Sequence, residues 1–291
     1  MNIARRNARE LLTFYLDAGA DALIGEEPVD RMAEPPAPER GRSPAVARGA
    51  SEAAAGGVRA DDPSPDRLRR SGPPLSGEGK TRAPAATPIA PEAAVMAARQ
   101  AAGNAQTLDE LRALLEAFEG CALRATATQL VFADGNPQAR VMFVGEAPGY
   151  DEDVVGRPFV GRSGKLLDLM MAAIGLKRET TYIANVVPWR PPGNRTPTPQ
   201  ETAICLPFIR RQIELADPDI LVCLGGPAMQ TLLGIKEGIT RARGKWFPYD
   251  TGKREVRALA TFHPAFLLRS PLQKRFAWRD FLALKKALAN K

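Results

Sequence analysis

Short apolar segments alternate with amphipathic helical segments from residue 139 to the end of the chain. The apolar segments predict strands at 139–145, 181–188, 219–226 and 256–264. Between and after them, helical patterns are found at 163–176, 198–216 and 275–289, with a short one after residue 226. Such alternation produces a parallel sheet that is covered by helices on both faces. We therefore expect an α/β fold, a three-layer α/β/α sandwich with a central four-stranded parallel sheet.

Several residues mark where these helices begin. Thr107 with Glu110 three residues later forms the pattern of a capping box, which predicts a helix at 107–118. Ser163 is a candidate N-cap for the helix at 163–176, and Pro199 suits the first position of the next helix.

The first third of the chain has a different composition. No aromatic residue occurs between Tyr15 and Phe118, so this stretch lacks the large apolar groups that build a packed core. We expect a helical segment at 1–30, a disordered Ala/Pro/Gly/Arg-rich linker at 31–92 and a folded domain at 93–291. The linker is either a basic tether with non-specific affinity for DNA or a solvated spacer, which is the commoner case.

Composition limits the chemistry of the folded part. The formal net charge of +7 favours a polyanionic partner. The single histidine, His263, excludes zinc sites that are built on two or three histidines. Three cysteines without a CxxC pair indicate reduced thiols, and we expect no metal. With no apolar run that is long enough to cross a membrane and no clear signal peptide, we expect a cytoplasmic monomer.

The predicted strands end in unusual sequences, namely GEAPG, NVVPWRPPGN, LGGP and FHPAFLLR. Ligands of parallel sheets bind beyond the carboxyl ends of the strands. Glu146, Asn185 and His263 should therefore share one rim of the sheet. Phe159, in a glycine-rich loop, either stacks on a flat ligand or fills the core. Asn185, in an apolar strand, is either a satisfied structural amide or a group that reads a base.

Four motifs together resemble family 4 of the uracil-DNA glycosylase superfamily. They are GEAPG followed by DED, PFVGRSG, YIANVVPWRPPGNRTPTP and HPAFLLR, and their order and spacing over residues 107–290 are similar to those of the family. The resemblance implies a monofunctional DNA glycosylase that flips deoxyuridine out of the helix and hydrolyses its N-glycosidic bond. Its partner would be uracil-containing DNA, either double-stranded or single-stranded.

The resemblance also implies roles for single residues. Phe159 would stack on the flipped base, Asn185 would bond to its N3–H and O4, and His263 would donate to O2. Glu146 would orient the attacking water, with weaker candidates at Asp151, Glu152 and Asn194. Backbone at Ala147 and Gly149 would enclose the base. DNA contacts would come from Ser163, Arg195, Leu267, Leu268 and Arg269, with the two leucines and Arg269 projecting from a loop.

One departure from the family concerns its four-iron, four-sulfur cluster, which four cysteines hold. Cys121 and Cys205 occupy two of those positions, but Arg124 and the Pro188–Trp189 pair stand at the others. A cluster needs four ligands, so we expect no cofactor, with Arg124 and Trp189 stacked in the cluster's place. Two alternatives stay open: a module that recognises uracil or abasic DNA without cutting, and a polymerase-associated role for residues 1–100.

Overall fold

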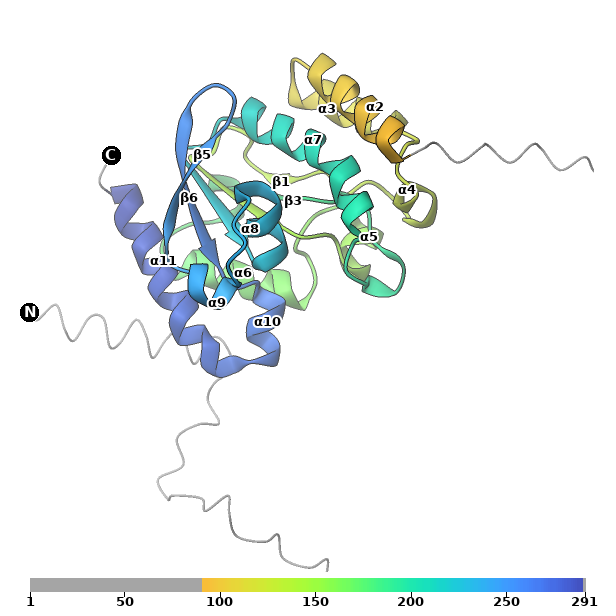
Figure 1. Ribbon diagram of the computed structural model, residues 1–291. Helices are drawn as coiled ribbons and strands as arrows, with labels where there is room; N and C mark the ends of the chain where they lie inside the picture. The colour runs from red at the N-terminus through yellow and green to blue at the C-terminus, as the bar shows by residue number, and fades with distance from the viewer. Residues whose placement is uncertain (1–90, 290–291) are drawn as a thin grey trace, which may run out of the picture. The chain divides into compact units, whose positions relative to one another are not determined.

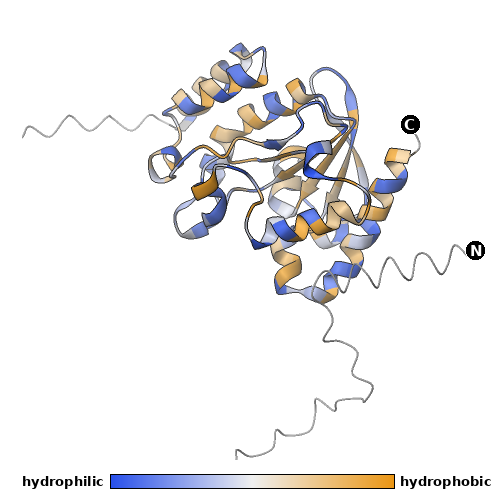
Figure 2. Ribbon diagram, turned by 180° about the vertical axis from the view of Figure 1, so that it is seen from behind, coloured by the Kyte–Doolittle hydropathy of each residue, from blue (hydrophilic) through white to orange (hydrophobic). Residues whose placement is uncertain are grey.

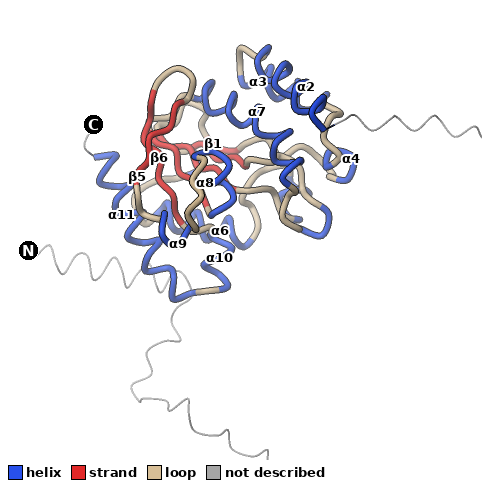
Figure 3. The backbone as a smooth tube through the Cα atoms, viewed as in Figure 1, coloured by secondary structure: helices blue, strands red, loops and turns tan. Residues whose placement is uncertain are grey.

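The computed structural model describes residues 91–289. It contains a six-stranded mixed sheet with the strand order β1-β3-β2-β4-β6-β5 (Figures 1 and 3). The N-terminal helix and nearly all of the linker that the sequence predicts lie outside the described residues. The strands are β1 (Asp134–Gly135), β2 (Val141–Gly145), β3 (Tyr182–Asn185), β4 (Ile220–Leu224), β5 (Trp246–Asp250) and β6 (Glu255–Thr261).

The four central strands β3, β2, β4 and β6 pair in parallel, as the alternation of segments predicts. The expected sheet was nevertheless too small, because β1 and β5 add an antiparallel strand at each edge. Both additions are hard to recognise from sequence. Strand β1 has two residues, and β5 contains Pro248, which an edge strand tolerates because it needs fewer backbone donors.

Helices cover both faces of the sheet, which confirms the three-layer architecture. The helices are α2 (Pro91–Asn104), α3 (Leu108–Ala117), α4 (Leu123–Thr126), α5 (Tyr150–Val155), α6 (Arg162–Ala172), α7 (Pro199–Ala216), α8 (Gly226–Leu233), α9 (Ile239–Ala242), α10 (Pro264–Arg269) and α11 (Lys274–Ala289). Short 3₁₀ turns lie at Arg178–Thr180, Pro192–Asn194 and Pro271–Gln273. None of the helices within residues 91–289 is long and apolar enough to span a bilayer.

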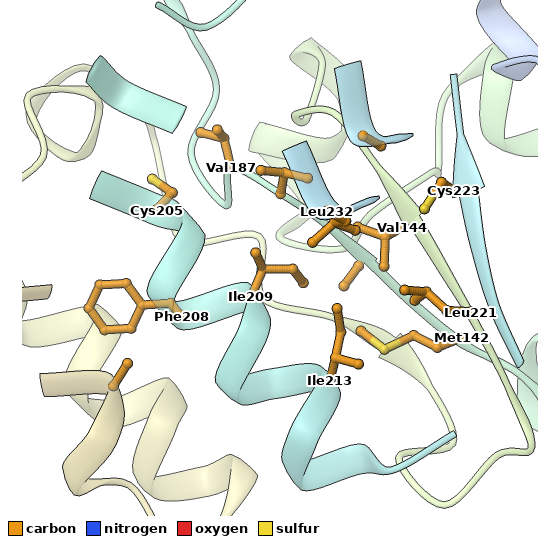
Figure 4. Packing of buried hydrophobic residues seen from close by; sticks show 14 of the residues in the cluster. Met142, Val144, Val187, Cys205, Phe208, Ile209, Ile213, Leu221, Cys223 and Leu232 are labelled. Carbon is orange, nitrogen blue, oxygen red and sulfur yellow. The ribbon is translucent and has the colours of Figure 1, made fainter. Parts of the chain in front are cut away.

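Alternate residues of each strand belong to different cores. Met142 and Val144 of β2 face the layer of α7, where Ile209 and Ile213 point toward them, while Phe208 packs on the other side of α7 against Phe118 (Figure 4). Val141 and Phe143 belong to the opposite core, which α6 and α11 cover. Figure 2 shows apolar residues concentrated on the inner side of the helices and polar ones on the outer side. The alternation of strand residues between the two cores, with a period of two, is what a sheet buried on both faces requires.

The helix caps agree with the sequence in two of three cases. Thr107 accepts from the Glu110 amide at the start of α3, and Thr198 with Glu201 forms a capping box before Pro199. The prediction that Ser163 caps α6 is wrong, since the cap is Gly161. The reason is a tertiary contact, because the Glu152 carboxylate accepts from the Gly161 amide and replaces a local side-chain cap.

Gly164 is required where α6 passes the loop before it. A Cβ atom at this position would lie 1.8 Å from the carbonyl oxygen of Phe159, which is backbone and cannot yield easily. We expect Gly164→Ala to lower the free energy of unfolding by about 1–3 kcal/mol, measured by urea denaturation.

The matched control for this prediction is Gly103→Ala in α2. A Cβ atom there meets nothing within 4 Å, so the same substitution should leave stability unchanged or raise it by up to about 1 kcal/mol. Equal stability of the two variants would contradict the proposed close approach.

Candidate active site

The carboxyl ends of the parallel strands open onto a cleft of about 660 Å³. Its lining contains Glu146, Ala147, Gly149, Phe159, Ser163, Asn185, Asn194, Arg195, His263 and Arg269. These residues are widely separated in sequence and were all expected at the site. Of the expected DNA contacts, Leu267 and Leu268 are not in this lining.

Asn185 is the last residue of β3 and lies beside Gly145, its registered partner on β2. Its side chain is buried, and its amide oxygen has no hydrogen-bond partner within the described residues. A Cβ atom at position 145 would lie 2.5 Å from that oxygen and 2.6 Å from the ring of Phe159. Glycine at this position therefore leaves space for both side chains.

Glu146 provides a second unpaired oxygen in the same cleft. Its Oε1 atom is buried without a partner in the described part of the chain, where Asn185 Oδ1 is the other such side-chain atom. Burial raises the pKa of the Glu146 carboxyl above its usual value. An unsatisfied buried polar group costs about 1–3 kcal/mol. A ligand that donates hydrogen bonds to these oxygens would recover that free energy.

Phe159 lies at the boundary between the core and the cleft. Its side chain is buried in the core that α6 and α11 cover, and it also lines the cleft. The ring lies 5.4 Å from the His263 ring, centre to centre, with an angle of 32° between the two planes. Its backbone is left-handed, with φ at 56°, a conformation that bulky residues rarely adopt.

His263 begins α10 and caps it with its own ring. The Nδ1 atom accepts from the amide of Ala265 at 3.1 Å, so Nδ1 is unprotonated. The proton of the neutral ring is then on Nε2, which becomes a donor. Burial, helped by the charge of Arg269, lowers the pKa of His263 to about 4. The ring is thus a neutral donor at physiological pH.

The weaker candidates for a water-binding role are engaged elsewhere or exposed. Glu152 is buried and accepts from three backbone amides, those of Gly149, Val160 and Gly161, at 2.9–3.1 Å. These bonds occupy both of its oxygens and connect the two loops of the cleft. Asn194 is exposed, and its Oδ1 accepts from Arg190 Nε at 2.6 Å. Asp151 is exposed as well.

The expected DNA-contacting residues separate into buried and exposed groups. The prediction that Leu267 projects from a loop is wrong, because residues 264–269 form α10 and Leu267 is completely buried on its inner face. Leu268 and Arg269 are exposed, and Ser163 is half-buried in the first turn of α6. Arg195 forms a bidentate ion pair with Glu201 at 2.7–2.8 Å.

Several lining residues were not singled out from the sequence. Gly225, Gly226 and Pro227 start α8 at the end of β4, and the LGGP strand end was the available signal for them. Phe262 and Phe266 pack against each other near the His263 side of the cleft, with ring centres 4.9 Å apart and 42° between the ring planes. The place of Phe266 beside the cleft depends on the helix that residues 264–269 form, which the sequence does not predict.

The family model of the uracil DNA glycosylase superfamily matches residues 132–283, which include the whole cleft. The chain belongs to this superfamily. It is 39% identical to a type-4 uracil-DNA glycosylase of Archaeoglobus fulgidus over 190 residues, 64% of this chain and 96% of the relative. For a type-4 enzyme of Thermotoga maritima the identity is 46% over 151 residues, 52% of this chain and 77% of that protein. A DNA polymerase of Bacillus phage SP01 is 30% identical over 158 residues, 54% of this chain but 17% of the polymerase.

The cysteines of this superfamily member do not fit a four-cysteine cluster. The sulfur atoms of Cys121 and Cys205 lie 4.0 Å apart and are buried. Arg124 donates twice to the Glu116 carbonyl, in place of the stacking on Trp189 that we considered. Cys223 is buried in β4, as expected of a core residue. Residues 91–289 contain no group of three or more His, Cys, Asp or Glu side chains that suits a metal ion. The absence of a cluster stays a prediction.

Because His263 is the only histidine of the chain, its titration is directly observable by NMR. The imidazole should stay neutral from pH 8 down to about pH 5, since its pKa is lowered to about 4, and it should carry its proton on Nε2. Nitrogen-15 shifts of the ring report both properties. Removing the nearby positive charge with Arg269→Gln should raise the pKa. Titration near 6.5, the ordinary value for histidine, would contradict this description.

Proposed function

We propose that this chain is a monofunctional uracil-DNA glycosylase, which hydrolyses the N-glycosidic bond of deoxyuridine in DNA to leave uracil and an abasic site. The observation that carries the proposal is the set of polar groups in the cleft. An unpaired amide oxygen of Asn185 accepts, the neutral His263 ring donates, and Phe159 offers an aromatic face. Uracil presents a donor at N3, acceptors at O2 and O4, and a flat ring. The type-4 relatives from Archaeoglobus and Thermotoga support the same substrate.

The depth of the cleft favours an extrahelical base. Asn185 is 4% exposed and Phe159 also 4%, so a base within a duplex cannot reach them. The deoxyuridine would therefore rotate out of the stack into the cleft. Asn185 would then accept from N3–H, and the buried amide would reject cytosine, which presents an acceptor at N3.

Bond cleavage leaves negative charge on the departing base and positive charge on the sugar. A donor aimed at uracil O2 stabilises the negative charge on the base. The Nε2–H of His263 is suited to this role, because its Nδ1 atom already accepts from the Ala265 amide. A neutral donor also avoids binding the substrate too tightly before the bond breaks.

Glu146 would act on the other side of the reaction. As a carboxylate it would orient or deprotonate the attacking water and offset the positive charge of the sugar. Its unpaired Oε1 atom faces no competing donor in the described part of the chain. The raised pKa makes this carboxyl a stronger base than an exposed one.

The DNA would lie across the rim formed by α6 and α10. Arg269 and Leu268 are exposed on α10, and Ser163 lies near the mouth in the first turn of α6. Leu268 would fill the space that the flipped nucleotide leaves, and Arg269 would bind phosphate. Arg195 would contact DNA only through the side of its guanidinium group that the ion pair with Glu201 leaves exposed.

The proposal is tested with an end-labelled oligonucleotide that carries one uracil. Wild-type protein should produce alkali-sensitive sites, and His263→Ala and Glu146→Gln should each lower the single-turnover rate by at least about 100-fold. Glu255→Gln is the control, because Glu255 is exposed at the opposite end of β6 from the cleft.

Two outcomes would contradict the proposal in different ways. Tight binding of uracil-containing DNA by wild type without any cleavage would favour a recognition module. Cleavage at the wild-type rate by both variants would support the activity but contradict the roles assigned to His263 and Glu146.

A further inference from the structure

Phe159 adopts a backbone conformation that its own residue type disfavours. Its φ angle is 56°, which few residues other than glycine and asparagine adopt readily. The surrounding structure must hold such a residue in place. Two charged side chains contact the peptide groups around it, namely Arg178, which was not expected at the site, and Glu152.

Arg178, in the 3₁₀ turn before β3, holds the carbonyl side. Its guanidinium donates to the carbonyl oxygen of Phe159 and, at 3.2 Å, to that of Pro158. The same group is fixed by Asp134 at 2.6 Å and by Asp168 at 2.8 Å. Arg178 does not line the cleft, and its hydrogen bonds to the loop at Pro158 and Phe159 connect it to a residue that does.

Glu152, in α5, holds the amides of the two residues that follow Phe159. One of its oxygens accepts from the amides of Val160 and Gly161 at 3.0 and 2.9 Å. The carbonyl of Phe159 and the two amides that follow it are thus bound by opposite charges from separate elements. Gly164 leaves the space in which the Phe159 carbonyl lies. Charged partners make the strongest of the ordinary hydrogen bonds.

We propose that Arg178 is a positioning residue, which acts with Glu152 to fix the backbone of Phe159 and so aims its ring at the base. This inference rests on the proposed function for the stacking role of the ring. It assigns a role to a residue that neither touches the substrate nor lies in any of the four motifs.

The test is a double-mutant cycle on uracil excision under single-turnover conditions. Arg178→Met should lower the single-turnover rate constant divided by the dissociation constant of the DNA by about 10- to 100-fold, because the Phe159 ring loses its orientation. In a Phe159→Ala background, Arg178→Met should cause less than about a threefold further loss. Losses that multiply would show that Arg178 acts independently of Phe159 and would overturn the proposal.

Arg254→Met is a matched control. Arg254 also binds two carboxylates, those of Asp217 and Asp219, and the carbonyl of a left-handed residue, Asp217. It lies before β6, away from the cleft. The control variant should excise uracil at the wild-type rate even if its melting temperature falls, which separates positioning from general stability.

Two further measurements keep the test decisive. If Arg178→Met does not fold, Asp168→Asn removes one support of Arg178, and its smaller loss should likewise vanish in the Phe159→Ala background. A crystal structure of either Arg178→Met or Asp168→Asn gives a readout without activity. The φ angle of Phe159 should leave the left-handed region, and an unchanged angle would overturn the proposal even if the proposed function itself fails.

Discussion

The parallel register of the four central strands determines where every group of the cleft lies. Gly145 of β2 pairs with Asn185 of β3, and Leu224 of β4 pairs with Thr261 of β6. The strands therefore end at the same level, and the residues that follow them meet above the sheet. A shift of one residue in β3 would turn Asn185 into the opposite layer and leave no amide in the cleft. The chemistry depends on this backbone pairing before it depends on any side-chain contact.

The cleft combines two buried side-chain oxygens that lack hydrogen-bond partners in the described residues with loops that are held firmly. Within residues 91–289, Asn185 Oδ1 and Glu146 Oε1 are buried without partners, which is costly in a folded protein and typical of sites that await a ligand. The surrounding loops are fixed by Glu152, by Arg178 and by the cap that His263 forms on α10. Asn185 and Glu146 thus lie beside loops that these hydrogen bonds hold in place.

The sequence predicts the four central strands, the long helices α6, α7 and α11 and about half of the cleft lining, because periodicity and strand ends are local properties. Helix α10 is not predicted, because Pro264 at its first position is equally typical of a loop, and the sequence therefore places Leu267 on a loop and not in the core. The short edge strand β1 carries too few residues for a pattern. Arg178 could not be recognised at all, because its role depends on a backbone angle at Phe159 and on two distant carboxylates.

The central claim is that the buried amide of Asn185 reads the N3 position of the base. It is tested most directly by comparing excision of deoxyuridine with excision of its N3-methyl derivative in otherwise identical oligonucleotides. The account predicts that wild type favours deoxyuridine by at least about 100-fold, and that Asn185→Ala loses most of this preference along with rate. Equal rates on the two substrates in wild type, or a preference that persists in Asn185→Ala, would contradict the claim.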